Sequence, residues 1–137
     1  MLRRSMNFTV ISLGMLFWLG LVLALTMLPG RGGLMRQIAL FFGQSDLHGA
    51  IGHMGLMASL VFVLFIGLVR IIPYKYALLL SVTAVFVVGT STEIYQSGVY
   101  GRASTLTDLL ANWVGAFSVG YMLSLWQKPS KKDTYSR

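Results

Sequence analysis

The sequence contains no cysteine, which excludes disulfide bonds, thiolate metal sites and a cysteine nucleophile. Charge is also scarce: Asp, Glu, Lys and Arg make up 11% of its 137 residues, and only four of these are acidic. No glycine-rich phosphate loop, no Ser/His/Asp nucleophile arrangement, no internal repeat and no domain linker stand out. This length fits a single domain, residues 1–137, for which we predict no cofactor.

Hydrophobic residues predominate in this sequence. Hydrophobic residues make up 55% of the chain and the mean hydropathy is +0.72, more than a soluble domain with a wet surface carries. Crossing a bilayer requires about 20 mostly apolar residues, and four stretches are that long: residues 8–28, 49–69, 76–96 and 106–126. Because continuous apolar runs are helical in lipid, the predicted fold is an all-α membrane protein, a bundle of four transmembrane helices.

An alternative for the first stretch is a cleaved signal peptide, because Arg3 and Arg4 precede it. The apolar run, however, is longer than the usual signal-peptide core of about 7–15 residues. It also ends at Leu28 and Pro29 without a pattern of small residues for cleavage. We therefore interpret it as the first span.

Positive charge is distributed unevenly between the two ends of these spans. Eight of the eleven Lys and Arg residues fall in the N-terminus, in the turn between the second and third spans, or in the C-terminal tail. The positive-inside rule therefore predicts that both termini are cytoplasmic, an N-in/C-in topology. We interpret the basic tail, residues 128–137, as an anchor on anionic lipid and not as a nucleic-acid arm.

The two outward connections differ in length. The first, residues 29–48, contains an apolar stretch at residues 34–42 that is too short to span. It could lie along the outer interface or re-enter the membrane. The second, residues 97–105, is short, and its glycines are typical of a tight loop.

The few polar residues of the spans share one depth. Each lies 14 to 18 residues from the cytoplasmic end of its own span, which corresponds to about 21–27 Å. These residues are His53 in the second span, Glu93 in the third, and Asp108 and Asn112 in the fourth. Gln96 and Arg102 follow directly above this layer.

Spacing within the fourth span supports a shared face. Asp108 and Asn112 are separated by four residues, so that they face one direction. Gly115 continues this stripe and would let another helix pack closely. Thr105 or Thr107 is a natural N-cap for this helix, next to the carboxylate of Asp108.

Ionisable groups at this depth normally face the bundle interior and pair, and two arrangements are open. In a closed structural network, Glu93 or Asp108 pairs with Arg102 and the remaining polar side chains complete hydrogen bonds. In a site open to the outer leaflet, the predicted acid–base or proton-carrying residues are Glu93, Asp108 and His53. The predicted head-group ligands in that site are Arg102, Gln96 and Asn112.

A metal site is a further interpretation of the histidines. His48 and His53 follow Asp46, but the spacing of four residues that would place both rings on one helical face is absent. We therefore predict no metal.

At these positions the sequence resembles the VanZ-like family, small bacterial membrane proteins named for a teicoplanin-resistance protein. The resemblance rests on six closely spaced positions and on one histidine in the second span: Glu93, Gln96, Arg102, Asp108, Asn112, Gly115 and His53. Gly120 extends it. The Asp-Lys pair that precedes this histidine in the family is replaced here by Gly49 and Ala50, and after a local shift Asp46 could take the place of the acid. The resemblance spans residues 8–126 and is most specific over residues 49–120.

The resemblance implies four helices, a bacterial cytoplasmic (inner) membrane location and a role in the cell envelope, including low-level resistance to glycopeptides of the teicoplanin type. It supplies no reaction, so enzyme status stays open. We expect the chain to bind, or act on, a lipid or lipid-linked glycan head group at the outer leaflet. Expected partners are membrane lipids, lipid-linked envelope precursors or an envelope-biosynthesis protein, and not nucleic acid. The alternatives are a proton-coupled transporter or flippase, and a non-catalytic subunit of an envelope-biosynthesis complex.

Overall fold

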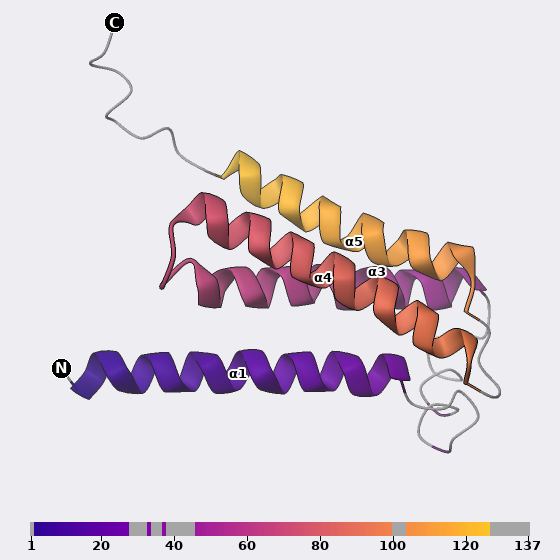
Figure 1. Ribbon diagram of the computed structural model, residues 1–137, viewed down its shortest axis with the longest axis horizontal. Coiled ribbons are helices and arrows are strands. Elements are labelled where there is room, and N and C mark those ends of the chain that lie inside the picture. Colours follow the sequence, from indigo (N-terminus) through magenta and orange to yellow (C-terminus); the bar gives the residue numbers. More distant parts are fainter. Residues whose placement is uncertain (1, 28–32, 34–36, 38–45, 100–103, 127–137) are drawn as a thin grey trace, which may run out of the picture.

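The computed structural model describes residues 2–27, 33, 37, 46–99 and 104–126. Four long helices follow one another in this part of the chain: α1 (Leu2–Met27), α3 (Asp46–Leu68), α4 (Tyr74–Ser97) and α5 (Leu106–Leu125) (Figure 1). The described residues contain no strand, which confirms the predicted all-α class. The predicted connection 29–48 falls almost entirely outside the described residues, as do Arg102 and the basic tail.

The ends of the helices follow local sequence signals. α4 begins directly after Pro73, whose φ of −56° suits a helix start while its ring leaves no N–H to satisfy. α5 begins after Thr105, whose hydroxyl accepts a hydrogen bond from the Asp108 backbone N–H at 3.1 Å. Of the two N-caps that the sequence allowed, the structure therefore uses Thr105.

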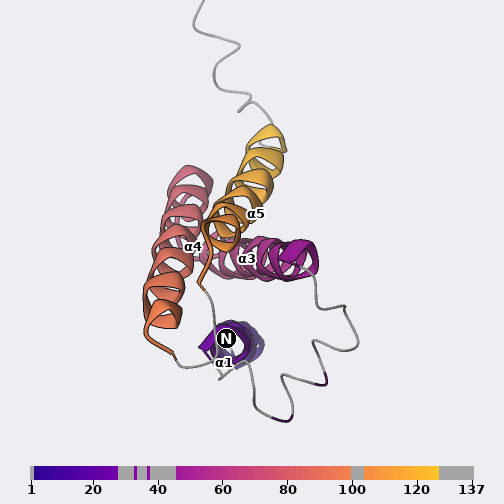
Figure 2. The same cartoon turned by 90° about the vertical axis from the view of Figure 1, so that its right-hand side faces the viewer.

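α3 is the central helix, packing against α1, α4 and α5. α1 lies on one side of α3 and α5 on the other, whereas α4 runs obliquely and its end comes close to α1 (Figure 2). The buried core includes Val22 from α1, Leu60 from α3, Val85 from α4 and Ala116 from α5. Because α3 runs antiparallel to both α1 and α4, the end of α1, the start of α3, the end of α4 and the start of α5 meet at one end of the bundle (Figure 1).

Apolar side chains cover the outside of the helices. Those that are exposed include Leu16, Phe17, Leu79, Val87 and Phe117. Such an extensive apolar surface is far larger than the patches on soluble monomers and fits a lipid environment. Polar side chains are instead found inside: Thr26, Ser81, Thr92, Glu93, Gln96 and Asn112 are all buried.

Three helices are long and apolar enough to cross a membrane: Phe8–Met27 of α1, Leu47–Leu68 of α3 and all of α4. Together with the apolar exterior, they indicate a multi-pass membrane protein. α5 has 20 residues and packs along α3 and α4, but it is not among the helices that this combination of length and apolar composition selects. A fourth span stays a prediction.

Candidate functional site

A buried polar cluster joins α3, α4 and α5 through one side chain from each helix. His53 Nδ1 lies 3.1 Å from Asn112 Oδ1 and 3.4 Å from Glu93 Oε1. Asn112 Nδ2 donates to Glu93 Oε1 at 3.1 Å. The three side chains thus form a closed triangle of polar contacts.

The surroundings of Asn112 determine how its amide is oriented. Its Nδ2 lies between two acceptors, Glu93 Oε1 and the Gly89 carbonyl, the latter at 3.3 Å. Only the amino group can donate to both, so the carbonyl oxygen faces His53. Because that oxygen accepts only, His53 Nδ1 carries a hydrogen and donates to it. In a neutral ring, Nε2 is then the nitrogen with a free lone pair.

Glu93 is the centre of the cluster and its side chain is almost entirely buried. The residue is 4% exposed and Asn112 is 1% exposed, whereas the side chain of His53 keeps 16% of its surface. Glu93 Oε1 accepts from Asn112 and faces His53, and Oε2 accepts from the Ser104 hydroxyl at 2.9 Å. Among the described residues, no buried side-chain nitrogen or oxygen lacks a partner. The carboxylate therefore accepts hydrogen bonds from α5 and from one loop, and it lies next to the His53 ring of α3.

Two glycines allow the helix backbones to come close enough for these contacts. A Cβ on Gly115 would lie 2.2 Å from the Met54 carbonyl oxygen, so α5 and α3 touch backbone to backbone there. A Cβ on Gly89 would lie 3.1 Å from Asn112 Cβ. The close approach that the sequence predicted at Gly115 is confirmed, and it brings Asn112 between α3 and α4.

An open groove of about 330 Å³ reaches the cluster between α4 and α5. Glu93 lines it together with three hydroxyl residues of the two helix ends and their loop, Ser97, Ser104 and Thr105. Thr90 and apolar side chains, among them Leu109, form the rest of its wall. This groove therefore opens from the buried carboxylate to the outside of the bundle along a mostly apolar wall that carries a few hydroxyls.

Asp108 lies at the start of α5 and is bonded within its own turn. Its Oδ2 accepts from the Thr105 hydroxyl at 2.7 Å, while its backbone N–H donates to the oxygen of that hydroxyl. Its other oxygen, Oδ1, faces α3 and lies 3.8 Å from the position that a Cβ on Gly49 would occupy. The described hydrogen bonds therefore make Asp108 part of a cap and do not join it to the His53–Glu93–Asn112 cluster.

Gln96 is also buried, at 2% exposure, but it bonds to a different helix. Its Nε2 donates to the Thr26 carbonyl of α1 at 2.6 Å. The amide nitrogen of Gln96 thus links the ends of α4 and α1. The head-group role predicted for this residue is therefore left to its amide oxygen and to the second hydrogen of its nitrogen.

The structure brings together three of the six predicted site residues, His53, Glu93 and Asn112. Asp108 and Gln96 lie at the same end of the bundle with partners of their own, and Arg102 lies outside the described residues. Sequence reasoning missed Ser104, whose hydroxyl completes the Glu93 environment. Its position directly before the N-cap Thr105, within a polar loop, was the available signal.

No group of three or more His, Asp or Glu side chains in the described ranges is placed to hold a metal ion. The chemistry available within the cluster is proton transfer and hydrogen bonding. A buried carboxylate next to an imidazole can take up or release a proton, and hydroxyls along the groove can bind a polar ligand.

Comparisons with protein-family models, with curated proteins and with solved structures found no match for this chain.

Proposed function

We propose that the chain is a VanZ-like integral membrane protein of the bacterial cell envelope that binds a lipid or lipid-linked glycan head group at the outer leaflet. The observation that carries the proposal is Glu93: a buried carboxylate, paired with His53 and Asn112, that lines a groove open to the exterior. Ionisable groups within membrane spans are rare and usually mark functional paths. Whether the chain also acts on the bound head group as an enzyme stays open.

The proposed topology has four spans with both termini in the cytoplasm of a cytoplasmic (inner) membrane. The groove lies at the end of α4 and the start of α5, opposite the end that holds the N-terminus and the α3–α4 turn (Figure 1). Because that turn and both termini carry most of the Lys and Arg residues, the positive-inside rule directs the groove outward.

The proposed chemistry assigns separate roles to the groove and the cluster. The hydroxyl groups of Ser97, Ser104 and Thr105 along the groove already donate their hydrogens within the chain. Their oxygens accept from the hydroxyls of a sugar or glycerol head group. Glu93, with His53 as its partner, accepts or relays a proton. In the sequence, Arg102 lies in the same loop, between Ser97 and Ser104, and supplies a cation for a phosphate or carboxylate.

The test is a set of three variants in a host that expresses the chain and is challenged with teicoplanin. Glu93→Gln, Arg102→Ala and Asp108→Asn are each expected to lower resistance toward the level of cells without the chain, while membrane abundance stays unchanged. Ser91→Ala is the matched control, because Ser91 is exposed on α4 and does not line the groove. If all three variants insert normally and keep wild-type resistance, the site proposal is wrong.

A second measurement identifies the ligand directly. Mass spectrometry of lipids that copurify with the wild-type protein is expected to show a glycolipid or lipid-linked glycan that Glu93→Gln and Arg102→Ala lose. If the wild-type protein does not change teicoplanin susceptibility but does retain such a lipid, the link to resistance is wrong and the binding site stands.

A second candidate function, a non-catalytic subunit whose cluster fastens three helices together, has one observation in its favour. Every buried side-chain nitrogen and oxygen in the described residues already has a partner within the chain, so the cluster is complete without a ligand. Under this candidate, Glu93→Gln leaves the phenotype unchanged, while a partner protein copurifies in stoichiometric amount.

A further inference from the structure

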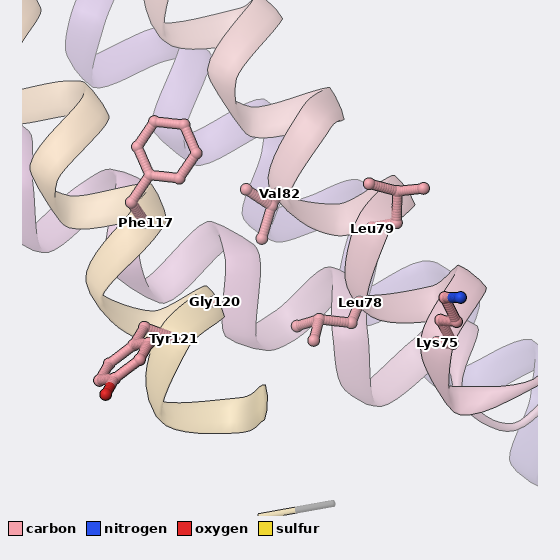
Figure 3. A pocket seen from close by; sticks show the side chains of 7 residues that line it. All are labelled: Lys75, Leu78, Leu79, Val82, Phe117, Gly120 and Tyr121. Atoms are coloured by element: carbon pink, nitrogen blue, oxygen red, sulfur yellow. The ribbon is translucent and has the colours of Figure 1, made fainter. Parts of the chain in front are cut away.

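A second groove lies at the opposite end of the same two helices. It has a volume of about 570 Å³ and runs between α4 and α5, with Lys75 and Leu79 on the α4 side and Phe117 and Tyr121 on the α5 side (Figure 3). The two grooves share no lining residue. This lower groove is therefore independent of the site proposed above.

The floor of the lower groove is a close contact between the two helices. A Cβ on Gly120 would lie 2.6 Å from Val82 Cγ2, so the absence of a side chain on Gly120 sets the depth of the groove. At its end, the Tyr74 hydroxyl donates to the Leu123 carbonyl and ties the start of α4 to the end of α5. The groove is consequently a built feature of the packed helices.

Charge is placed at one end of this groove only. Lys75 is the second residue of α4 and is exposed, whereas the other described lining residues carry no charge. Because α4 is one of the three apolar spans, its first turn lies at a membrane boundary and the rest of the groove lies at the depth of acyl chains. The groove therefore has a cation at the membrane boundary and an uncharged, mostly apolar wall below it.

A lipid fits this pattern better than a helix of a second copy does. A helix from a second copy would cover Lys75 with apolar side chains and take its charge out of water, which is unfavourable. An anionic phospholipid instead offers a phosphate at the boundary and a flexible chain below it. We propose that the lower groove binds an anionic phospholipid of the leaflet next to the α3–α4 turn, with one acyl chain between Leu79 and Tyr121 and the phosphate on the Lys75 ammonium.

Native mass spectrometry of the detergent-purified full chain tests the head-group part. Phosphatidylglycerol and phosphatidylcholine with identical acyl chains are the two probes. A Lys near the membrane surface contributes about 1 kcal/mol toward an anionic lipid, or about fivefold in affinity. We expect the wild type to favour phosphatidylglycerol by about that factor and Lys75→Gln to lose the preference.

Arg70→Gln is the matched charge control, because Arg70 is exposed in the same turn and does not line the groove. It is expected to keep the phosphatidylglycerol preference. If Arg70→Gln and Lys75→Gln lower the preference equally, the attraction is a general property of the basic turn and the proposed site is wrong.

A filling substitution tests the acyl-chain part. Leu79 is 62% exposed and lines the groove, whereas Leu80 is 51% exposed on the same helix but does not. Leu79→Trp is expected to lower binding of both lipids, and Leu80→Trp to leave it unchanged. Equal binding by both tryptophan variants would overturn the proposal. So would a wild-type dimer that Leu79→Trp converts to a monomer, because the groove would then hold a second copy.

Discussion

Asn112 is the residue on which the polar cluster depends most. Its amide makes all the hydrogen bonds that an amide oxygen and nitrogen need here: to His53, to Glu93 and to the Gly89 carbonyl. Because the amide both donates and accepts, it can bridge an imidazole N–H and a carboxylate. An aspartate or a leucine of similar size cannot do both.

We predict that Asn112→Leu destabilises the fold far more than Glu93→Gln does. The leucine leaves Glu93 and His53 buried without their amide partner, at a cost of about 1–3 kcal/mol for the unsatisfied groups. In Glu93→Gln the new amide oxygen can accept from Asn112 while its nitrogen donates to Ser104, so we expect a loss below about 1 kcal/mol. Denaturant titration in mixed micelles measures both free energies of unfolding.

Ser118→Ala, at an exposed position of α5, is the control for this comparison and should leave stability unchanged. An Asn112→Leu variant as stable as the wild type would contradict the role assigned to the amide.

At the scale of the helices, glycines decide which pairs come close. Gly115 faces backbone, because a Cβ there would lie 2.2 Å from the Met54 carbonyl oxygen. Gly67 faces a side chain, because a Cβ there would lie 1.9 Å from Met15 Sδ. The two contacts are similar in distance, but a backbone carbonyl within a helix cannot move aside, whereas a thioether can adopt another rotamer.

We therefore predict that Gly115→Ala and Gly67→Ala differ in effect. Gly115→Ala forces α5 away from α3 and is expected to lower the free energy of unfolding by about 3 kcal/mol, at the upper end of the usual range for overpacking. Gly67→Ala is expected to cost less than about 1 kcal/mol, because Met15 moves. The same titration in micelles measures both, and equal losses would show that the α1–α3 contact is as rigid as the α3–α5 contact.

At the scale of the whole molecule, three apolar spans and an apolar exterior indicate a membrane protein, and orientation follows from charge. The absence of cysteine makes this orientation directly testable, because each introduced thiol is the only one in the chain. Suitable exposed positions are available at both ends of the bundle: Ile71 in the α3–α4 turn, Ser97 at the end of α4 and Trp126 after α5.

We predict that a membrane-impermeant maleimide labels Ser97→Cys in intact spheroplasts but labels Ile71→Cys and Trp126→Cys only after lysis. The first two positions test the orientation that the positive-inside rule favours. The third tests whether α5 crosses the membrane, because Trp126 lies on the cytoplasmic side only if it does. Labelling of Trp126→Cys in intact spheroplasts would show that α5 does not cross the membrane. Labelling of Ile71→Cys there would show that the orientation is opposite to the predicted one.

Much of this structure was predictable from local sequence. Continuous apolar runs of span length dictate helices, because lipid offers the backbone no other partners, and Pro73 and Thr105 mark where two of them begin. Counting residues along His53, Glu93 and Asn112 predicts one common depth, since the rise per residue is constant.

Tertiary structure decided which residues at that depth meet. Depth follows from position along a helix, but contact depends on how the helices rotate and on how closely they pack. Asp108 is bonded within its own cap, Gln96 faces α1, and Ser104 reaches Glu93 from a loop. Both grooves likewise arise from the space that α4 and α5 leave between them, and no single stretch of sequence records that space.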